Sequence, residues 1–247
     1  MKSSVACLEL KISIVVPAFN EEKRIQPFLV ELINYCKTHL NDFEIIVVND
    51  GSTDNTEGIV KCIIAMHNAN FVKYIGYQTN SGKGTAIKIG ICNAKGEKIL
   101  FIDADGSIKP KEISRMLKYL DDYDLVIGDR KSKESRITRA QPIPRQIASL
   151  LFNAIVKLLF QIKVRDSLCG FKGFTSKVRD NIGVNLRAIR WVFDVELLYK
   201  AQKRRYKCFQ MPIEWEHKDN SKVRLKEYLK IFYEIVQIKG QNLFLRS

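Results

Sequence analysis

The chain has 247 residues, enough for one large α/β domain with a substantial core or for two small domains. Its 41 basic residues outnumber 27 acidic ones, and the formal net charge of +14 predicts an anionic partner: nucleic acid, a phospholipid surface or a phosphorylated substrate. Six scattered cysteines lack the pairing of a zinc site or a secreted disulfide framework, so we expect a reduced, cytosolic protein. A signal peptide and an uninterrupted run of about 18 apolar residues are both missing, which predicts peripheral rather than spanning contact with any membrane.

Short apolar runs alternate with segments of helical period through the first half of the chain. The pattern predicts strands over 12–17, 44–50, 72–77, 98–103 and 125–128, and helices over 25–37, 82–94 and 110–120, with another helix opening at Asp54. This alternation is typical of a doubly wound parallel sheet with right-handed crossovers. Polar residues follow each strand, so one edge of the sheet should hold Pro17, Asn20, Glu21, Asp50, Lys83, Asp103 and Asp105.

The pattern changes after Arg130. Residues 131–145 are basic and contain Pro142 and Pro144, which predicts a mobile segment or lid. The segment 147–163 is predicted to be a helix rich in large apolar residues with basic flanks, suited either to a bilayer interface or to packing on the sheet. Strands over 169–174 and 207–215 and a helix over 193–204 follow, and the tail over 225–244 is predicted to be an amphipathic helix.

The predicted strand at 98–103 ends in two carboxylates one residue apart, Asp103 and Asp105. Ligands of open α/β sheets gather beyond the carboxyl ends of the strands, and alternating residues of an extended backbone share a side. Both carboxylates can therefore face one hard cation, Mg²⁺ or Mn²⁺, that bridges a diphosphate. The alternative is a polar turn that caps the following helix.

Two further strand ends carry candidate binding groups. A carboxylate at Asp50 could accept the imide N–H of a uracil, although residues 50–54 also form an ordinary turn and helix N-cap pattern. Gly82-Lys83-Gly84 before a helix resembles a phosphate cradle, but it is shorter than a Walker A loop.

Four motifs at successive strand ends resemble the family 2 glycosyltransferases with the GT-A fold, a Rossmann-like, mostly parallel sheet flanked by helices. They are Val15-Val-Pro-Ala-Phe-Asn-Glu-Glu22, Val47-Val-Asn-Asp-Gly-Ser-Thr-Asp54, Asn80-Ser-Gly-Lys-Gly84 and Asp103-Ala-Asp105. Residues 128–130, 165–172, 190–198 and 221–223 resemble dolichyl-phosphate β-glucosyltransferases, and dolichyl-phosphate mannose synthases share a looser version. The resemblance covers nearly the whole chain and implies a catalytic domain over 1–224, followed by an amphipathic helix over 225–247 suited to a membrane surface.

The resemblance also implies roles for single residues. Pro17, Phe19, Glu21 and Asp50 would line the nucleoside pocket, Lys83 would lie near the donor phosphates, and Asp103 and Asp105 would hold the metal and diphosphate. Phe19 stands where tyrosine is common, and Ser107 stands where mannose synthases often have glutamine. The amino-terminal anchor of the similar eukaryotic enzymes is missing, so we expect a prokaryotic polyprenyl-phosphate pathway at the cytoplasmic face of a membrane.

The implied reaction is inverting transfer of a hexose, with glucose from UDP-glucose favoured, to a polyprenyl or dolichyl phosphate. Such an acceptor is already ionised, since the second pKa of a phosphate monoester is about 6, so a strong general base is unnecessary. Candidates to position the acceptor phosphate are Arg130, Arg139, Arg145 and Lys222. Asp166 and Asp194 join Asp105 and Arg130 as candidate catalytic residues, and the alternative for both aspartates is an ion pair with a neighbouring arginine.

Other functions remain open at this point. A GDP-mannose-dependent polyprenyl-phosphate mannosyltransferase would share the fold, although the stretch from Trp191 to Glu196 favours glucose. The charge suggests a nucleic-acid-binding protein, but helix-turn-helix, zinc and aromatic–basic RNA signatures are missing, and we expect no nucleic-acid partner. Nucleotidyltransferases have a similar sheet, but their Gly-rich loop is replaced here by Pro17-Ala-Phe-Asn-Glu21. Trp191 and Trp215 either stack on the hexose or pack in the core.

Overall fold

The structure, a computed structural model, describes residues 11–187, 190 and 192–218. The predicted C-terminal helix, the proposed boundary at residue 224, Trp191 and the candidate acceptor residue Lys222 lie outside the described residues.

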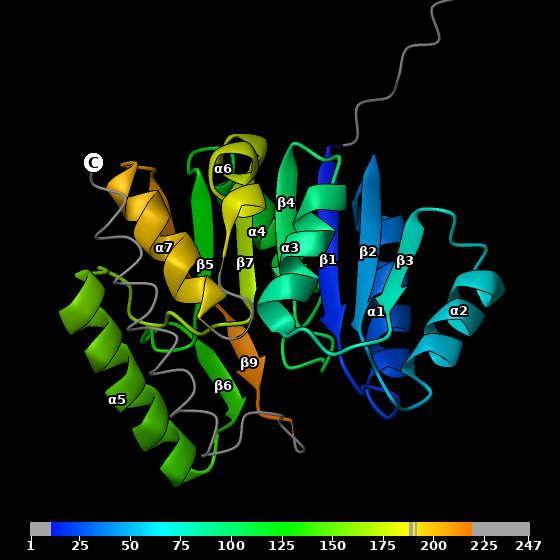
Figure 1. Cartoon of the computed structure of the whole chain (residues 1–247), viewed down its shortest axis with the longest axis horizontal. Coiled ribbons are helices and arrows are strands. Elements are labelled where there is room, and N and C mark those ends of the chain that lie inside the picture. The colour runs from blue at the N-terminus through cyan, green and yellow to red at the C-terminus, as the bar shows by residue number, and fades with distance from the viewer. Residues whose placement is uncertain (1–10, 188–189, 191, 219–247) are drawn as a thin grey trace, which may run out of the picture.

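A seven-stranded sheet forms the centre of the described part of the chain (Figure 1), with the order β3-β2-β1-β4-β7-β5-β8. Its strands are β1 Ile12–Ala18, β2 Phe43–Asp50, β3 Val72–Tyr77, β4 Lys98–Ile102, β5 Leu125–Asp129, β7 Phe171–Thr175 and β8 Cys208–Pro212. All neighbours pair in parallel except β7, which is antiparallel to both β4 and β5. The expected mostly parallel, Rossmann-like sheet is confirmed.

Alternate strand residues face two separate helical layers. Leu100 and Ile102 of β4 pack in the core with α1 Ile25–His39, α2 Thr56–Met66 and α4 Lys111–Tyr119. Ile99 and Phe101 face the other core, which includes α3 Lys83–Asn93, α6 Ser176–Asn181 and α7 Phe193–Lys203. A short 3₁₀ helix, η1, spans Gly183–Asn185. Since both faces of the strands are buried, their sequences are continuous apolar runs rather than alternating ones.

The segment expected to be a mobile lid contains regular structure. Strand β6, Arg136–Arg139, pairs in parallel with β9, Glu214–Glu216, in a second, two-stranded sheet. Helix α5, Ile143–Phe160, begins four residues before the predicted start. The two prolines stand at its N-cap and in its first turn, where a missing N–H is harmless, so they begin the helix instead of preventing it.

The predicted strand over 207–215 is divided between the two sheets. Strand β8 ends at Pro212, and β9 begins at Glu214 beside β6. Ile213 is buried at this change of direction, and its carbonyl accepts the N–H of Arg136 (3.1 Å). This exchange brings β9 over the carboxyl ends of the main sheet, where it forms part of the cavity described next.

Candidate active site

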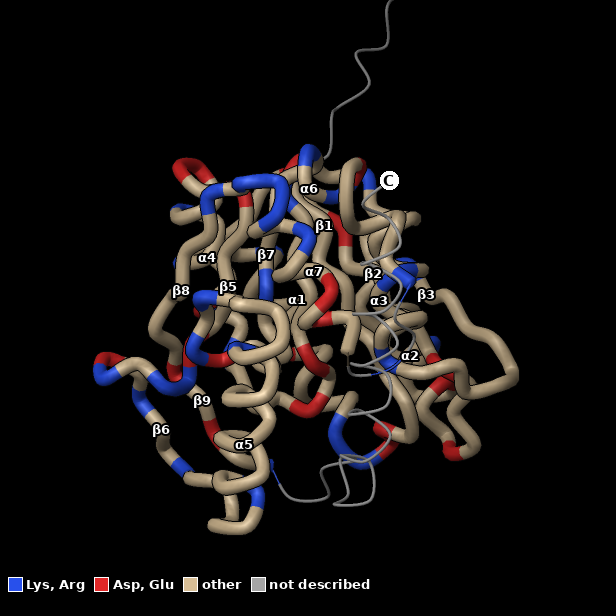
Figure 2. The backbone as a smooth tube through the Cα atoms, turned by 60° about the vertical axis from the view of Figure 1, so that its left-hand side comes forward, with Lys and Arg blue, Asp and Glu red and all other residues tan. Residues whose placement is uncertain are grey.

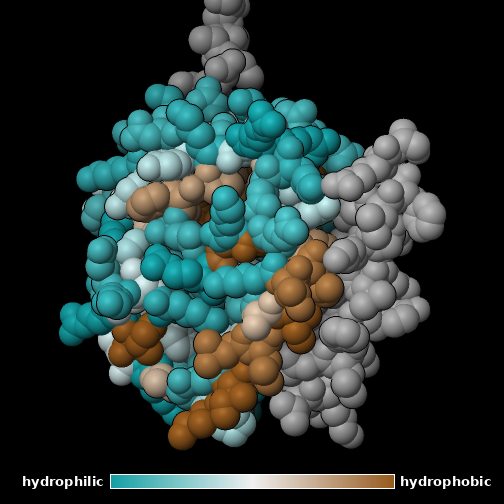
Figure 3. All heavy atoms as spheres, turned by 90° about the vertical axis from the view of Figure 1, so that its left-hand side faces the viewer, coloured by the Kyte–Doolittle hydropathy of each residue, from teal (hydrophilic) through white to brown (hydrophobic). Residues whose placement is uncertain are grey.

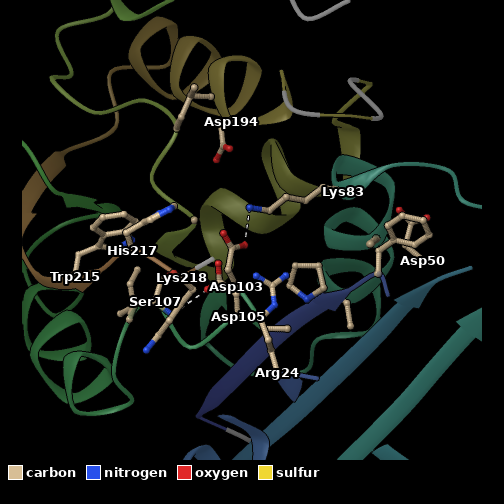
Figure 4. Close-up of a pocket in the computed structure, with 18 of the residues that line it drawn as sticks. Arg24, Asp50, Lys83, Asp103, Asp105, Ser107, Asp194, Trp215, His217 and Lys218 are labelled. Atoms are coloured by element: carbon tan, nitrogen blue, oxygen red, sulfur yellow. Dashed lines mark hydrogen bonds and ion pairs between the residues drawn. The ribbon is translucent and has the colours of Figure 1, made fainter. Parts of the chain in front are cut away.

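A cavity of about 390 Å³ lies at the carboxyl ends of the main-sheet strands, and residues of α5 and of the β6–β9 region close it from the other side. Figure 4 shows charged side chains converging on it from several elements. The cavity brings together most of the residues expected from the sequence: Pro17, Phe19, Asp50, Lys83, Asp103, Asp105, Arg130, Arg145 and Asp194. Glu21, Arg139 and Asp166 are not among its lining residues.

The carboxylates of Asp103 and Asp105 lie at the floor of this cavity. An ion pair of 2.5 Å joins Asp103 to Lys83, the first residue of α3. Asp105 accepts the backbone N–H of Ser107 (2.9 Å), a turn permitted by the positive φ of Gly106. Burial and the neighbouring charge of Asp103 raise the pKa of Asp105, because both disfavour its ionised form. The two carboxylates are therefore close enough for the charge of one to disfavour ionisation of the other.

This donor set fits a divalent cation that is shared with a substrate. Two carboxylates supply hard oxygen ligands, whereas the described residues contain no group of three or more His, Cys, Asp or Glu able to hold a metal. Mg²⁺ commonly binds through one or two carboxylates together with substrate phosphates and water. Asp103 and Asp105 could therefore hold a divalent cation together with phosphate groups of a substrate, but they do not form a closed protein cage.

Strand β7 closes the floor beneath Asp103. The backbone N–H of Asp103 donates to the carbonyl of Gly170 (3.1 Å) at the start of this antiparallel strand. A Cβ atom at residue 170 would overlap the Asp103 carboxylate, so any larger residue there would force this carboxylate to move. Because β7 runs antiparallel to β4, its beginning lies beside the end of β4 and restricts the position of the Asp103 carboxylate.

Asp50 organises the loop that leads into α3. Its carboxylate accepts hydrogen bonds from the Tyr77 hydroxyl (2.8 Å), the Asn80 side-chain amide (2.9 Å) and the backbone N–H groups of Ser81 (2.7 Å) and Gly82 (2.9 Å). These bonds occupy much of the accepting capacity of one carboxylate. Asp50 lines the cavity, and it also fixes the backbone immediately before Lys83.

Glu21 reaches the cavity indirectly. Its carboxylate binds the guanidinium of Arg24 through two bonds, to Nε (2.7 Å) and to Nη2 (2.6 Å), and Arg24 does line the cavity. The backbone N–H of Glu21 donates to the Thr56 hydroxyl (2.8 Å), which ties this loop to the start of α2. Sequence reasoning missed Arg24, although the spacing of three residues after Glu21 was a usable signal.

Asp166 is likewise a partner of an arginine in the cavity. It is fully buried and binds Arg130 at Nε (2.6 Å) and Nη2 (2.8 Å), while the guanidinium carbon of Arg130 lies 5.4 Å from the centre of the Trp215 ring. Burial alone would raise the pKa of Asp166, but the charge and hydrogen bonds of Arg130 outweigh it and hold that pKa below its ordinary value. The alternative of an ion pair with an arginine is therefore what the structure contains.

Asp194 also faces cations. Its carboxylate pairs with Lys172, which is fully buried and donates a second bond to the Cys169 carbonyl (2.6 Å). Burial raises the pKa of Asp194 despite the opposing charges of Lys172 and Lys83. Its partner is thus a lysine, where the sequence suggested an arginine.

Several cavity residues had no role assigned from the sequence. Besides Arg24 these include Arg190, His217 and Lys218. Arg190 stands in a motif that resembled the glucosyltransferases, but His217 and Lys218 follow β9, whose position over the cavity depends on pairing with β6. Arg139 lies on the exposed strand β6, and its carbonyl accepts the N–H of His217 (2.9 Å).

The sheet, with a carboxylate-lined cavity at the carboxyl ends of its strands, defines an α/β protein with the ligand site of an open α/β sheet, and comparison with known sequences gives the family. Residues 13–183 match the sequence model of glycosyl transferase family 2, and the chain belongs to that family. It is therefore a glycosyltransferase with the GT-A fold, as the motifs suggested, and the nucleotidyltransferase and nucleic-acid-binding alternatives are set aside.

Individual relatives have names more specific than that of the family. The chain is 33% identical over 248 residues to human dolichyl-phosphate beta-glucosyltransferase, covering 96% of this chain and 75% of that protein. It is 34% identical over 241 residues to dolichyl-phosphate beta-glucosyltransferase ALG5C of Trichomonas vaginalis, covering 93% of this chain and 71% of the relative.

Solved structures support the fold. Glucosyl-3-phosphoglycerate synthase from Mycobacterium tuberculosis, in complex with Mn²⁺, UDP and phosphoglyceric acid, aligns with a TM-score of 0.69 at 20% identity, covering 92% of this chain and 76% of that one. S. aureus TarS 1-349 in complex with UDP-GlcNAc aligns with a TM-score of 0.58 at 20% identity, covering 91% and 65% of the two chains.

Proposed function

We propose that this protein transfers glucose from UDP-glucose to a polyprenyl or dolichyl phosphate, with inversion at the sugar C1. Relatives at 33–34% identity are named dolichyl-phosphate beta-glucosyltransferases, which supports glucose as the sugar and a lipid phosphate as the acceptor. One observation carries the proposal: a single cavity contains two different charged groups. One is the carboxylate pair with Lys83, and the other, further along the sheet, is Arg130 held by Asp166. A reaction between a nucleoside diphosphate sugar and an anionic acceptor needs both kinds of subsite.

The donor subsite would extend from β2 to β4. Pro17, Phe19 and Asp50 would line its nucleoside end, and Asp103 and Asp105 would hold Mg²⁺ or Mn²⁺. When bound, the metal would supply neutralisation of the charge on the departing diphosphate. Lys83 is close enough to Asp103 to add a second positive charge at the same place.

The acceptor subsite would lie toward β5 and α5, where Arg130 and Arg145 line the cavity. A phosphate oxygen of the acceptor would form the new bond to C1 as the bond from C1 to the nucleoside diphosphate breaks, and the diphosphate would leave with the electron pair. Since that phosphate is largely ionised at neutral pH, the step requires positioning and no strong base. The pairing of Asp166 and Asp194 with cations agrees with a structural and electrostatic role for both.

Helix α5 is proposed to rest on the cytoplasmic face of a membrane. By length and composition it is apolar enough to cross a bilayer, and 22% of its 18-residue window is buried. Figure 3 shows an apolar stripe along it, to which its exposed large side chains contribute: Ile143, Ile147, Leu150, Leu151 and Leu158. Lysine and arginine positions lie along β6 and beside α5 (Figure 2). An interfacial helix with basic neighbours would let a lipid-linked phosphate reach Arg130 from the bilayer.

The test is transfer of labelled sugar from a panel of UDP- and GDP-linked donors to a polyprenyl phosphate. We expect product from UDP-glucose in the presence of Mg²⁺ or Mn²⁺, with calorimetry showing tighter metal-dependent binding of UDP than of GDP. Faster transfer from GDP-mannose would favour the mannosyltransferase alternative. Equal transfer to a water-soluble alcohol would refute the lipid phosphate acceptor.

A further inference from the structure

Arg24 is a cavity-lining cation with no role in the reaction proposed above. Its side chain is 17% exposed and is held by Glu21, whose side chain is 9% exposed, through the two bonds described above. Glu21 is in turn anchored to α2 by the bond from its N–H to Thr56. Two successive contacts therefore restrict the guanidinium, and a restricted planar fork loses little entropy when it binds an anion.

The position of Arg24 relates it to the carboxylate pair. Figure 4 shows Arg24 beside Asp103 and Asp105 in the cavity that all three residues line. In the strand order, β1 lies between β2, which ends at Asp50, and β4, which precedes Asp103. Arg24 follows β1, so it stands between the proposed nucleoside end and the proposed metal site.

Arg130 has the same construction on the other side of the carboxylate pair. Both arginines use Nε and Nη2 to bind a buried carboxylate, Glu21 in one case and Asp166 in the other. Strand β5, which carries Arg130 just beyond its end, is separated from β4 by β7, whereas β1 is the opposite neighbour of β4. The cavity thus contains two pre-oriented arginines that flank the carboxylate pair, and the reaction has two phosphate-bearing ligands.

We propose that Arg24 binds the diphosphate of the nucleotide-sugar donor and that Glu21 is the positioning residue that orients it. This inference rests on the proposed function, because it takes the donor to be a nucleoside diphosphate sugar. A guanidinium matches phosphate oxygens with two parallel hydrogen bonds, which an ammonium group cannot reproduce. The cation at Arg24 would complement Lys83 on the other side of the diphosphate.

The experiment compares two ligands that differ by the diphosphate. Affinity for UDP in the presence of Mn²⁺ is measured by calorimetry, and affinity for uridine is measured by ligand-observed NMR. For Arg24→Gln we expect about a 10- to 100-fold loss of UDP affinity, the scale of a charged hydrogen bond, and less than about a 3-fold change for uridine. Arg24→Lys should recover part of the UDP affinity, and Glu21→Gln should lower it by an intermediate factor.

The control is Arg115→Gln. Arg115 binds buried Glu112 with the same spacing of three residues and a 2.6 Å contact, but this pair lines a different pocket with Lys111 and Glu214. Arg115→Gln should leave UDP affinity unchanged, and the melting temperatures of the two glutamine variants show whether lost binding reflects lost folding. If Arg24→Gln is less stable than Arg115→Gln, the affinity of Arg24→Lys for UDP is the deciding measurement. Wild-type UDP affinity in Arg24→Lys would contradict recognition of the diphosphate by the planar guanidinium.

Two results would overturn the inference. Unchanged UDP affinity in Arg24→Gln would remove Arg24 from the donor site, and equal losses for UDP and uridine would assign it to the nucleoside pocket. A wild-type protein that binds neither UDP nor UDP-glucose with Mn²⁺ would instead refute the donor itself, and with it the proposed function.

Discussion

The proposed metal ligand Asp105 has a carboxyl group whose ionisation opposes folding. Burial and the charge of Asp103 raise the pKa of Asp105 in the folded protein. The free energy of unfolding therefore decreases as pH rises through that pKa and the carboxyl group ionises. Asp105→Asn should therefore leave unchanged or increase the free energy of unfolding of the metal-free protein at pH 7, while transfer falls at least about 100-fold. Thermal unfolding and initial rates measure the two effects. A clear decrease in melting temperature would contradict this assignment.

Removal of the metal tests the same pair without a substitution. Transfer should disappear in excess EDTA and return when Mg²⁺ or Mn²⁺ is added, because without a cation the two carboxylates would repel the departing diphosphate and offset the charges of Lys83 and Arg24. The measurement is product formation, with residual metal determined independently. Full activity in verified metal-free buffer would rule out a cation at Asp103 and Asp105.

Asp166 provides a prediction about pH. Its pKa is held below the ordinary value near 3.9, so its stabilising contribution is present above that value and is lost as pH falls through the lower pKa of the folded protein. Asp166→Asn should cost about 3 kcal/mol at pH 7, since it leaves the mostly buried Arg130 without its counter-charge. Urea unfolding should show a constant difference above about pH 5 that shrinks below about pH 4.

The ion pair between Arg179 and the exposed carboxylate of Asp180 supplies the control for that prediction. Asp180 is 62% exposed, so Asp180→Asn should cost less than about 1 kcal/mol at any pH. Equal costs for the two substitutions would show that the Asp166 pair contributes no more than a surface contact.

At the scale of an element, strand β7 places Gly170 against Asp103. Gly170→Ala should displace the Asp103 carboxylate and lower both transfer and metal-dependent UDP binding by at least about 10-fold, because a Cβ atom there would overlap that carboxylate. The control is Gly183→Ala, where a Cβ would lie 3.1 Å from Cγ2 of Ile91, away from the cavity. Wild-type metal and UDP binding in Gly170→Ala would mean that the strand does not set the carboxylate position.

Helix α5 gives the second prediction at this scale. Leu151 is 62% exposed, and Leu151→Glu places a charge on the apolar stripe, so it should abolish sedimentation with anionic vesicles and transfer to a lipid acceptor while UDP binding is retained. Met66 on α2 is 75% exposed and serves as the matched control, since Met66→Glu alters an apolar side chain of another helix. Equal vesicle binding in both variants would exclude α5 as the contact.

For the whole molecule, the net charge of +14 predicts how membrane binding responds to salt. Electrostatic attraction to anionic lipid contributes about 1 kcal/mol for each basic residue near the surface and is screened within about 10 Å at 0.1 M salt. Sedimentation with phosphatidylserine vesicles should therefore weaken as salt rises from 0.05 to about 0.5 M, and neutral vesicles should bind less. Salt-independent binding to both would point to apolar contact alone.

Local sequence was sufficient for most of the main sheet. Buried parallel strands appear as apolar runs, and each predicted run at 12–17, 44–50, 72–77, 98–103 and 125–128 corresponds to a strand within a residue or two. The groups that follow those strands, such as Asp50 and Asp103, meet in one cavity because parallel strands share an edge for their carboxyl ends. Fold class and the centre of the candidate site were therefore contained in hydrophobic periodicity and strand-end polarity.

The remaining features depend on contacts between residues distant in sequence. The antiparallel direction of β7, the pairing of β6 with β9, and the partnership of Asp166 with Arg130 each join segments more than 20 residues apart. Neither hydrophobic period nor motif spacing specifies which carboxylate will meet which arginine after the chain has folded back. The sequence alone determined where polar groups end the strands, and only the tertiary structure decided which of them face the cavity and which hold another residue in place.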